Sequence, residues 1–156
     1  MFYVETMKND FVDISICGEL NYRLFLSVIK HELDKLGYAD IAAVQALILM
    51  NLGDNVVTIT EVMSRGYYIG SNASYNIRRL VANGYISQSP SDYDKRAVLL
   101  QTTAKGEELC LKVNAALSGH IKKFEQKMRE KLDMKRGLEF LRNVERAWKD
   151  FLQDAM

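Results

Sequence analysis

Amide, hydroxyl and guanidinium side chains recur at helical spacing in residues 71–79, and side chains of these types can contact a polyanion. On a helical projection, the apolar Ala73, Ile77 and Leu80 share one face. The residues around the other face are Ser71, Asn72, Ser74, Tyr75, Arg78 and Arg79. In a duplex major groove, arginine can pair with guanine and asparagine with adenine. We therefore predict that Asn72, Tyr75 and Arg78 contact bases and that Ser71 and Arg79 hold phosphates. The alternative is that these side chains are only the solvent-exposed side of the helix and bind no ligand.

Charge is distributed unevenly along the chain, although the net charge is only +1. Residues 1–64 carry four cations and nine anions, whereas residues 65–106 carry six cations and two anions. A cluster of Pro, Ser and Asp from Pro90 to Lys95, which includes Asp94, separates two strand-like runs, and Arg96 begins the second run. Such a cluster predicts a β-hairpin with a polar tip. The middle third of the chain is therefore where a polyanion is expected to bind.

The elements expected to position these residues are mainly helices. Apolar residues three and four apart predict a long amphipathic helix over 10–36, with Gly37 as its C-terminal cap. Asp40 is expected to cap a buried helix that continues through Met50. Thr58 and Glu61 have the spacing of a capping box, and Thr103 can cap another helix. The remaining elements are expected, in order, as a strand over 56–59, a helix ending at 66–70, a helix from 71 to 84, hairpin strands over 85–89 and 96–101, a long helix after 103 and a last helix from about 134.

Length and composition favour one ordinary globular domain over 1–156. The chain has 156 residues, of which 48% are hydrophobic, so it can bury a core without disulfides or metal. Its two cysteines fit a reducing compartment. The N-terminus does not resemble a signal peptide, and the most apolar run, 41–50, is about half of what a bilayer requires. A cytoplasmic location is expected.

Catalytic and metal-binding patterns are scarce. The histidines, His31 and His120, lie in no HExxH-type spacing, and the two cysteines do not form a CxxC pair. The sequence has no phosphate loop and no nucleophile elbow. We expect a protein that is not an enzyme and needs no cofactor. The alternative is a zinc site formed at long range by His31, His120 and Cys110.

The segment that follows the predicted hairpin tip resembles a known family. Residues 94–106, DKRAVLLQTTAKG, are similar to the wing signature of MarR-family transcriptional regulators, with Asp94, Arg96, Thr103 and Gly106 in register. Thr102 stands where the family has leucine. Residues 59–86 resemble the two DNA-binding helices of that family, but 66–70, GYYIG, replaces its small-residue turn. The resemblance implies a mainly α fold: a winged helix-turn-helix with a small β-hairpin wing, plus N- and C-terminal helices that form a dimerisation region.

The resemblance also implies roles for particular segments. In the family, the wing arginine enters the minor groove, so Arg96 would do so here, with Lys95 on a phosphate and Asp94 orienting Arg96. Residues 40–102 would form the DNA-binding lobe, and 10–36 with 103–154 the dimerisation helices. The expected protein is a homodimer on a pseudo-palindromic operator, acting as a repressor. A small aromatic effector would bind in a cleft that could be lined by Tyr38, Leu47, Met50 and Met63.

The sequence leaves two other functions open. The first is a winged-helix module that binds an acidic protein partner through the basic face. The second is a redox-sensing regulator, because some family members sense peroxide through a cysteine in the first helix. Cys17 would be the sensor, with Tyr22 and Tyr38 available as partners. The plainer interpretation of Cys17 is a small core residue beside Ile16 and Leu20.

Overall fold

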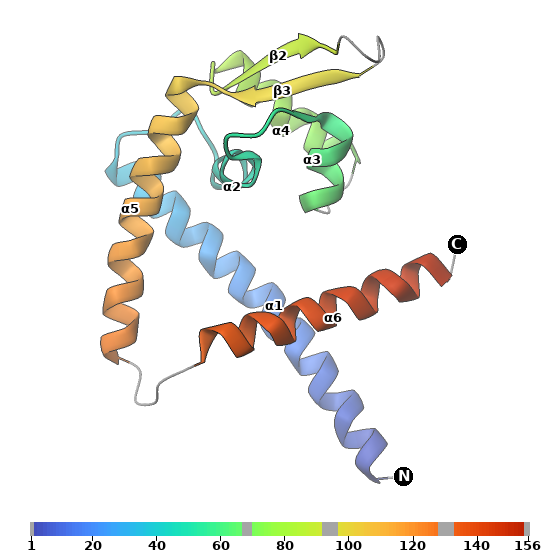
Figure 1. Cartoon of the computed structure of the whole chain (residues 1–156). Helices are drawn as coiled ribbons and strands as arrows, with labels where there is room; N and C mark the ends of the chain where they lie inside the picture. Colours follow the sequence, from blue (N-terminus) through green and yellow to red (C-terminus); the bar gives the residue numbers. More distant parts are fainter. Residues whose placement is uncertain (1, 67–69, 92–96, 128–132, 155–156) are drawn as a thin grey trace. The chain divides into compact units, whose positions relative to one another are not determined.

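The computed structural model describes residues 2–66, 70–91, 97–127 and 133–154, and these are mainly helical (Figure 1). The order of elements is α1 (Phe2–Lys35), α2 (Ala43–Leu52), β1 (Val57–Thr58), α3 (Ile59–Gly66), α4 (Gly70–Ala82), β2 (Ile86–Pro90), β3 (Val98–Thr102), α5 (Ala104–Lys127) and α6 (Met134–Asp154). This order confirms the expected fold class, a winged helix-turn-helix flanked by further helices. The predicted start of the first helix near residue 10 is wrong, because α1 begins at Phe2 and no proline or glycine interrupts residues 2–9.

The three strands form one antiparallel sheet in the order β1-β3-β2. The hairpin of β2 and β3 pairs Ile86 with Thr102 at one end and Pro90 with Val98 at the other. The short β1 pairs Val57 with Leu100 on the opposite edge of β3. This hairpin forms the wing, and the sheet fastens it to the segment that precedes α3.

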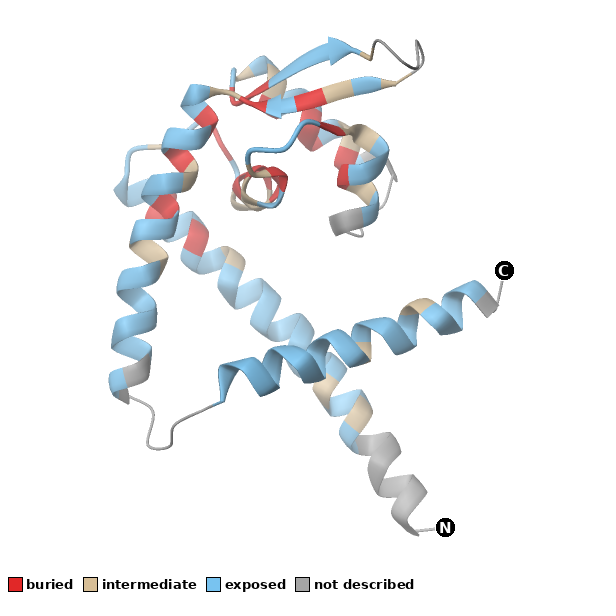
Figure 2. Cartoon of the chain, in the orientation of Figure 1, coloured by how far each residue is buried: buried red, intermediate tan, exposed pale blue. Residues whose placement is uncertain are grey.

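The core lies around α2, which contacts α1, α3, α4 and β3. Figure 2 shows the buried residues gathered in α2 and in the parts of other elements that surround it. The fully buried side chains include Ile29, Leu33, Ile48, Leu49, Ile77, Leu80, Tyr85, Leu100, Leu109 and Val113. The apolar run of residues 41–50 thus forms the central helix, as the sequence predicts.

Local capping residues begin and end the helices at most of the expected positions. Thr58 Oγ1 accepts a hydrogen bond from the Glu61 amide at 3.2 Å, and Glu61 Oε2 accepts one from the Thr58 amide at 2.7 Å, which is a complete capping box. Thr103 Oγ1 accepts from the Gly106 amide at 3.3 Å and caps α5. Gly37 (φ 81°) and Gly84 (φ 75°) adopt the left-handed conformation after α1 and α4.

The expectation that Asp40 caps α2 is wrong. Ala42 is the N-cap residue, and its amide donates to Gln45 Oε1 at 2.9 Å. The carboxylate of Asp40 instead accepts hydrogen bonds from Tyr85 and Lys105. Tertiary partners therefore displaced the local capping interaction that the sequence favoured.

The chain forms two compact units, Met1–Ala116 and Leu117–Met156. In the second unit, α6 is amphipathic, and its apolar side chains lie exposed: Met134, Leu138, Phe140, Leu141, Trp148, Phe151 and Leu152. Within the described residues, no helix combines the length and apolar character that a membrane span requires.

Candidate nucleic-acid interface

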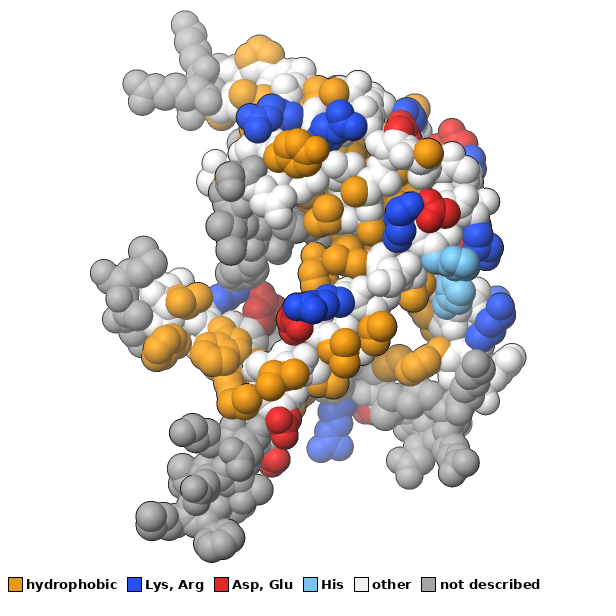
Figure 3. All heavy atoms as spheres, turned by 180° about the vertical axis from the view of Figure 1, so that it is seen from behind, with side chains coloured by type: hydrophobic (Ala, Val, Ile, Leu, Met, Phe, Trp, Pro, Cys, Tyr) orange, Lys and Arg blue, Asp and Glu red, His pale blue; other side chains and the backbone are white. Residues whose placement is uncertain are grey.

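Helix α4 presents a polar, basic face because its apolar face is buried. Ala73, Ile77 and Leu80 are 0–1% exposed, as the helical projection predicts. On the other side, Asn72, Tyr75, Arg78 and Arg79 are exposed, and Ser74 is half-buried. The side chain of Ser71 lies outside the described residues. Figure 3 shows basic side chains (blue) on the surface over α4. The face therefore combines hydrogen-bonding groups and positive charge on one rigid element, which suits the major groove.

Two buried amides that sequence reasoning missed fasten α4 to α2. Asn76 and Gln45 are 4% and 6% exposed, and Gln45 Nε2 donates to Asn76 Oδ1 at 3.1 Å. Asn76 is the polar member of the inward face that also carries Ala73, Ile77 and Leu80. A polar residue on that apolar stripe was the signal available in the sequence, because a buried amide must find partners.

Helix α3 contacts both the sheet and α4. Val62 is buried, whereas Met63 is half-buried. The capping box at Thr58 and Glu61 fixes the start of α3 next to strand β1. Residues 67–69 of the turn between α3 and α4, which include both tyrosines of the GYYIG segment, lie outside the described residues.

The wing residues Asp94, Lys95 and Arg96 also lie outside the described residues. The strands that flank them are described up to Ser91 and from Ala97, where the Ser91 amide donates to the Ala97 carbonyl at 3.1 Å. The described strands thus pair as a hairpin, as the sequence predicts. The roles of these three residues remain predictions.

A polar cluster joins the start of α2, the end of α4 and the start of α5. The Tyr85 hydroxyl donates to Asp40 Oδ1 at 2.7 Å, and Lys105 Nζ donates to Asp40 Oδ2 at 3.1 Å and to the Asn83 carbonyl at 2.8 Å. Lys105 Nζ also lies 4.0 Å from the centre of the Tyr85 ring. The Tyr85 hydrogen bond, helped by Lys105, holds the pKa of Asp40 below its usual value. Burial, followed by the hydrogen bond to Asp40, raises the pKa of Tyr85.

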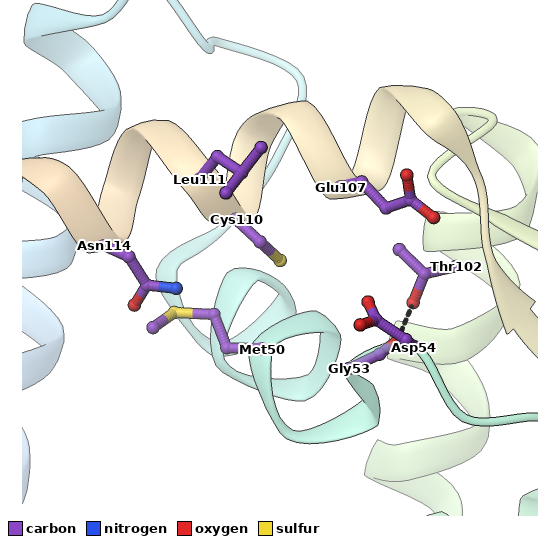
Figure 4. Close-up of a pocket in the computed structure, with 8 residues that line it drawn as sticks. All are labelled: Met50, Gly53, Asp54, Thr102, Glu107, Cys110, Leu111 and Asn114. Atoms are coloured by element: carbon purple, nitrogen blue, oxygen red, sulfur yellow. Dashed lines mark hydrogen bonds between the residues drawn. The ribbon is translucent and has the colours of Figure 1, made fainter.

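A small cavity of about 270 Å³ lies between the end of α2 and the start of α5 (Figure 4). It is lined by Met50, Gly53, Asp54, Thr102, Glu107, Cys110, Leu111 and Asn114. Of the four residues expected to line an effector cleft, Met50 borders this cavity, while Tyr38, Leu47 and Met63 are not among its lining residues. Burial, with the nearby Asp54 and Glu107 carboxylates, raises the pKa of the Cys110 thiol to about 11.

Cys17 lies exposed on α1, in contrast to the core position that is usual for a lone cysteine. Asn21 Nδ2 donates to Cys17 Sγ at 3.3 Å and to the Cys17 carbonyl at 2.8 Å. Asn21 is therefore the described hydrogen-bond partner of this thiol. For metals, the described residues contain no cluster of three or more His, Cys, Asp or Glu side chains that could hold an ion.

Comparisons with known proteins agree on the kind of domain. Residues 41–106 match the winged helix DNA-binding domain family. The exopolysaccharide II synthesis transcriptional activator ExpG of Rhizobium meliloti is 30% identical over 126 residues, which is 81% of this chain and 65% of that protein's length. The structure of Staphylococcus aureus MarR in complex with salicylate and kanamycin matches with a TM-score of 0.74 and 23% identity, over 94% of this chain and 95% of that one.

A mutant MarR from E. coli, complexed with operator DNA, also has the same fold. Its TM-score is 0.67 at 20% identity, over 86% of this chain and 94% of that one. Both MarR structures thus share the fold of this chain over most of its length, and the resemblance inferred from residues 59–106 is confirmed at the level of domain and fold.

Proposed function

We propose that the protein is a sequence-specific, DNA-binding transcriptional regulator of the MarR type, because its residues 41–106 match the winged helix DNA-binding domain family and its fold is that of a MarR structure. The relative from Rhizobium meliloti is named a transcriptional activator, and the E. coli MarR structure holds operator DNA. Both support a regulator that works by binding a duplex.

The observation that carries this proposal is the orientation of α4. Burial of Ala73, Ile77 and Leu80 leaves Tyr75, Arg78 and Arg79 on the surface. In a helix-turn-helix, the second helix enters the major groove and presents such side chains to base edges and phosphates. Arg78, Tyr75 and Asn72 are proposed to contact bases, and Arg79 and Ser71 to hold phosphates.

The wing supplies the second contact in this proposal. Strands β2 and β3 pair as a hairpin from Ile86 and Thr102 to Pro90 and Val98, and in our proposal the chain between them carries the DNA contacts of the wing. An arginine at such a tip is attracted to a narrow minor groove, where the negative potential is enhanced. We assign this position to Arg96, with Lys95 on a phosphate and Asp94 as the acceptor that orients Arg96.

The functional unit is proposed to be a homodimer. Helix α1 carries a row of exposed apolar residues, among them Ile16, Leu20, Leu24 and Phe25, which are 40–60% exposed. Figure 3 shows hydrophobic side chains (orange) on the surface along α1. Helix α6 carries further exposed apolar residues, including Trp148 and Phe151. Apolar surface on that scale marks an interface with a partner, and a twofold dimer would place two copies of α4 on a pseudo-palindromic operator.

The experiment that tests the proposal is a selection of bound fragments from genomic DNA by the full chain, followed by titration of the selected sequence at several salt concentrations. If about four cations in each protomer meet phosphates, log K should fall with log salt at a slope of roughly −7. Binding that is salt-sensitive but indifferent to sequence, together with a tight protein partner, would instead establish a protein-interaction module.

The sign of regulation follows from where the operator lies relative to the promoter. The sequence favoured repression, whereas the name of the relative favours activation. Transcription in vitro from a promoter that carries the selected operator gives the sign directly: added protein lowers the transcript of a repressed promoter and raises that of an activated one.

An effector for the small cavity would be a compact aromatic molecule, since a cavity of about 150 Å³ already holds one benzene ring. The cavity measures about 270 Å³, and Asp54 and Glu107 contribute carboxylates to its wall. A neutral or cationic aromatic compound suits the negative charge of these two carboxylates better than an aromatic acid does. Its addition should release the operator if it favours a conformation in which the two α4 helices are wrongly spaced. Equal affinity for DNA at saturating effector contradicts this mode of control.

A further inference from the structure

A chain of side-chain amides runs from the N-terminus of α2 to the first turn of α4. The Ala42 amide donates to Gln45 Oε1 at 2.9 Å, and Gln45 Nε2 donates to Asn76 Oδ1 at 3.1 Å. Asn76 Nδ2 then donates twice to Asn72, to its backbone carbonyl at 2.9 Å and to its side-chain Oδ1 at 3.0 Å. Four hydrogen bonds thus connect the core helix to an exposed residue on the predicted DNA-binding face.

The two ends of this chain fix the orientation of every amide in it. At one end, the backbone N–H of Ala42 can only donate, so Gln45 must present its oxygen there. At the other end, the backbone carbonyl of Asn72 can only accept, so Asn76 must present its nitrogen there. The contact between Gln45 and Asn76 then has one donor and one acceptor. A flip of either buried amide would place two like groups in contact, and an unsatisfied buried amide is costly.

The orientation of the exposed Asn72 follows from the same chain. Asn76 Nδ2 lies against Asn72 Oδ1, so the carbonyl end of the Asn72 side chain is held toward the helix. Its Nδ2 is consequently the end that remains to face solvent. None of the described residues accepts a hydrogen bond from Asn72 Nδ2. Asn72 is therefore presented to a ligand as a hydrogen-bond donor with two N–H groups.

We propose that Asn72 recognises a guanine in the operator, donating to N7 and O6, and that Asn76 is the positioning residue that holds it in this orientation; the proposal rests on the DNA-binding function above. Guanine presents two acceptors in the major groove, whereas cytosine presents a donor. The usual pairing of asparagine with adenine requires the side-chain oxygen to accept from the adenine N6 amino group. In this structure, the hydrogen bond from Asn76 holds that oxygen toward the helix and leaves the amino group of Asn72 as the outward end.

The decisive variant is Asn72→Asp, tested in the full chain by selection from random DNA and by competition among operators that differ at one base pair. Aspartate keeps the oxygen that accepts from Asn76 and replaces the outward donor by an acceptor. Since a carboxylate accepts from cytosine N4, we expect the preference at one base pair in each half-site to change from guanine to cytosine. The change in relative affinity should be on the order of 10-fold or more.

A second variant tests the role of Asn76. Asn76→Leu removes the oxygen that accepts from Gln45 and the nitrogen that donates to Asn72. It should reduce discrimination at the same base pair, while the preferences at other positions persist. Ile77→Val is the matched control, because it removes one buried methylene from the neighbouring position of α4. It should lower the melting temperature and leave the base preferences unchanged. If Asn76→Leu does not fold, Asn72→Asp alone decides, since Asn72 is exposed.

The outcomes separate this proposal from the one on which it rests. Wild-type protein that shows no sequence preference at all overturns both. Wild-type protein that selects a specific operator, but prefers adenine at the position that Asn72→Asp alters, overturns the orientation of Asn72 and leaves DNA binding intact. Equal weakening of all operators by Asn72→Asp likewise overturns base recognition by Asn72, because the residue would then hold a phosphate.

Discussion

The hydroxyl of Tyr85 donates a hydrogen bond to Asp40 across 45 positions of sequence, at 2.7 Å. Tyr85 is fully buried and follows α4, whereas Asp40 precedes α2, so this bond helps to fix the end of one helix to the start of the other. Tyr85→Phe removes the donor and keeps the ring. We expect the free energy of unfolding in urea to fall by about 1 kcal/mol, since the Asp40 side chain is half exposed. Tyr75→Phe, on the exposed face of α4, should leave it unchanged.

The effect of Tyr85→Phe should depend on pH. The Tyr85 hydroxyl and Lys105 hold the pKa of Asp40 below its ordinary value of 3.8. The stabilisation that accompanies a lowered carboxyl pKa is present above the ordinary value and is lost as pH falls through the lowered one. The difference in urea midpoint between wild type and Tyr85→Phe should therefore shrink between about pH 6 and about pH 3. A difference that stays constant, or grows, contradicts this assignment.

Gly106 lies where the wing signature ends, and a side chain cannot fit there. A Cβ atom at Gly106 would lie 2.5 Å from the Tyr85 carbonyl oxygen and 2.7 Å from Thr102 Cγ2. Gly106→Ala should lower the free energy of unfolding by about 1–3 kcal/mol through overpacking. In the control Gly119→Ala, the new Cβ meets no atom of the described residues within 4 Å, and the change should stabilise the helix by up to about 1 kcal/mol. Thermal unfolding of both variants checks the pair.

Arg78 should contribute to operator binding and not to stability, because its side chain is exposed. Arg78→Ala is expected to weaken binding by about 1–3 kcal/mol at fixed salt and to relax specificity at one base pair. Arg96→Ala should also weaken binding, and the loss should be smaller on operators whose flanks are GC-rich. Neither variant should change the stability by more than about 1 kcal/mol. Wild-type affinity in both test variants refutes the interface.

A charge on the apolar row of α1 should disrupt the proposed dimer. Leu20 is 53% exposed in the single chain, so Leu20→Glu is tolerated by the monomer fold but would bury a carboxylate in an interface. We expect sedimentation equilibrium to show a shift from dimer to monomer, and operator affinity to fall with it. Val98→Glu places the same charge on an exposed apolar residue of β3 and should leave the oligomeric state unchanged. If Leu20→Glu remains dimeric, the interface lies elsewhere.

The two cysteines should differ in reactivity. Cys110 is half-buried, and burial raises the pKa of its thiol to about 11, so little thiolate forms near neutral pH. Cys17 is exposed. A thiol reagent near neutral pH should label one site rapidly, and Cys17→Ser should abolish the rapid phase.

Redox control would add a second result: mild peroxide should abolish operator binding by wild type and not by Cys17→Ser. If operator binding by wild type survives peroxide, Cys17 is not a redox switch.

Much of the fold was predictable because its signals are local. The capping box of Thr58 and Glu61 and the left-handed Gly37 and Gly84 depend on neighbours within a few residues. The two faces of α4 follow from helical periodicity alone, and the structure has Ala73, Ile77 and Leu80 buried as expected. The cap proposed at Asp40 failed for the complementary reason, since its carboxylate meets Tyr85 and Lys105 from distant parts of the chain.

Amino-acid order was enough to establish the succession of elements, the winged helix fold and the outward side chains of α4, because helix periods and caps depend on short-range geometry. The meeting of Gln45 with Asn76, which holds the Asn72 oxygen toward the helix, emerged only in the folded chain. The physical reason is that a buried amide must be satisfied wherever the fold brings a partner. Two residues 31 positions apart share no local pattern, and their contact exists only when α2 packs against α4.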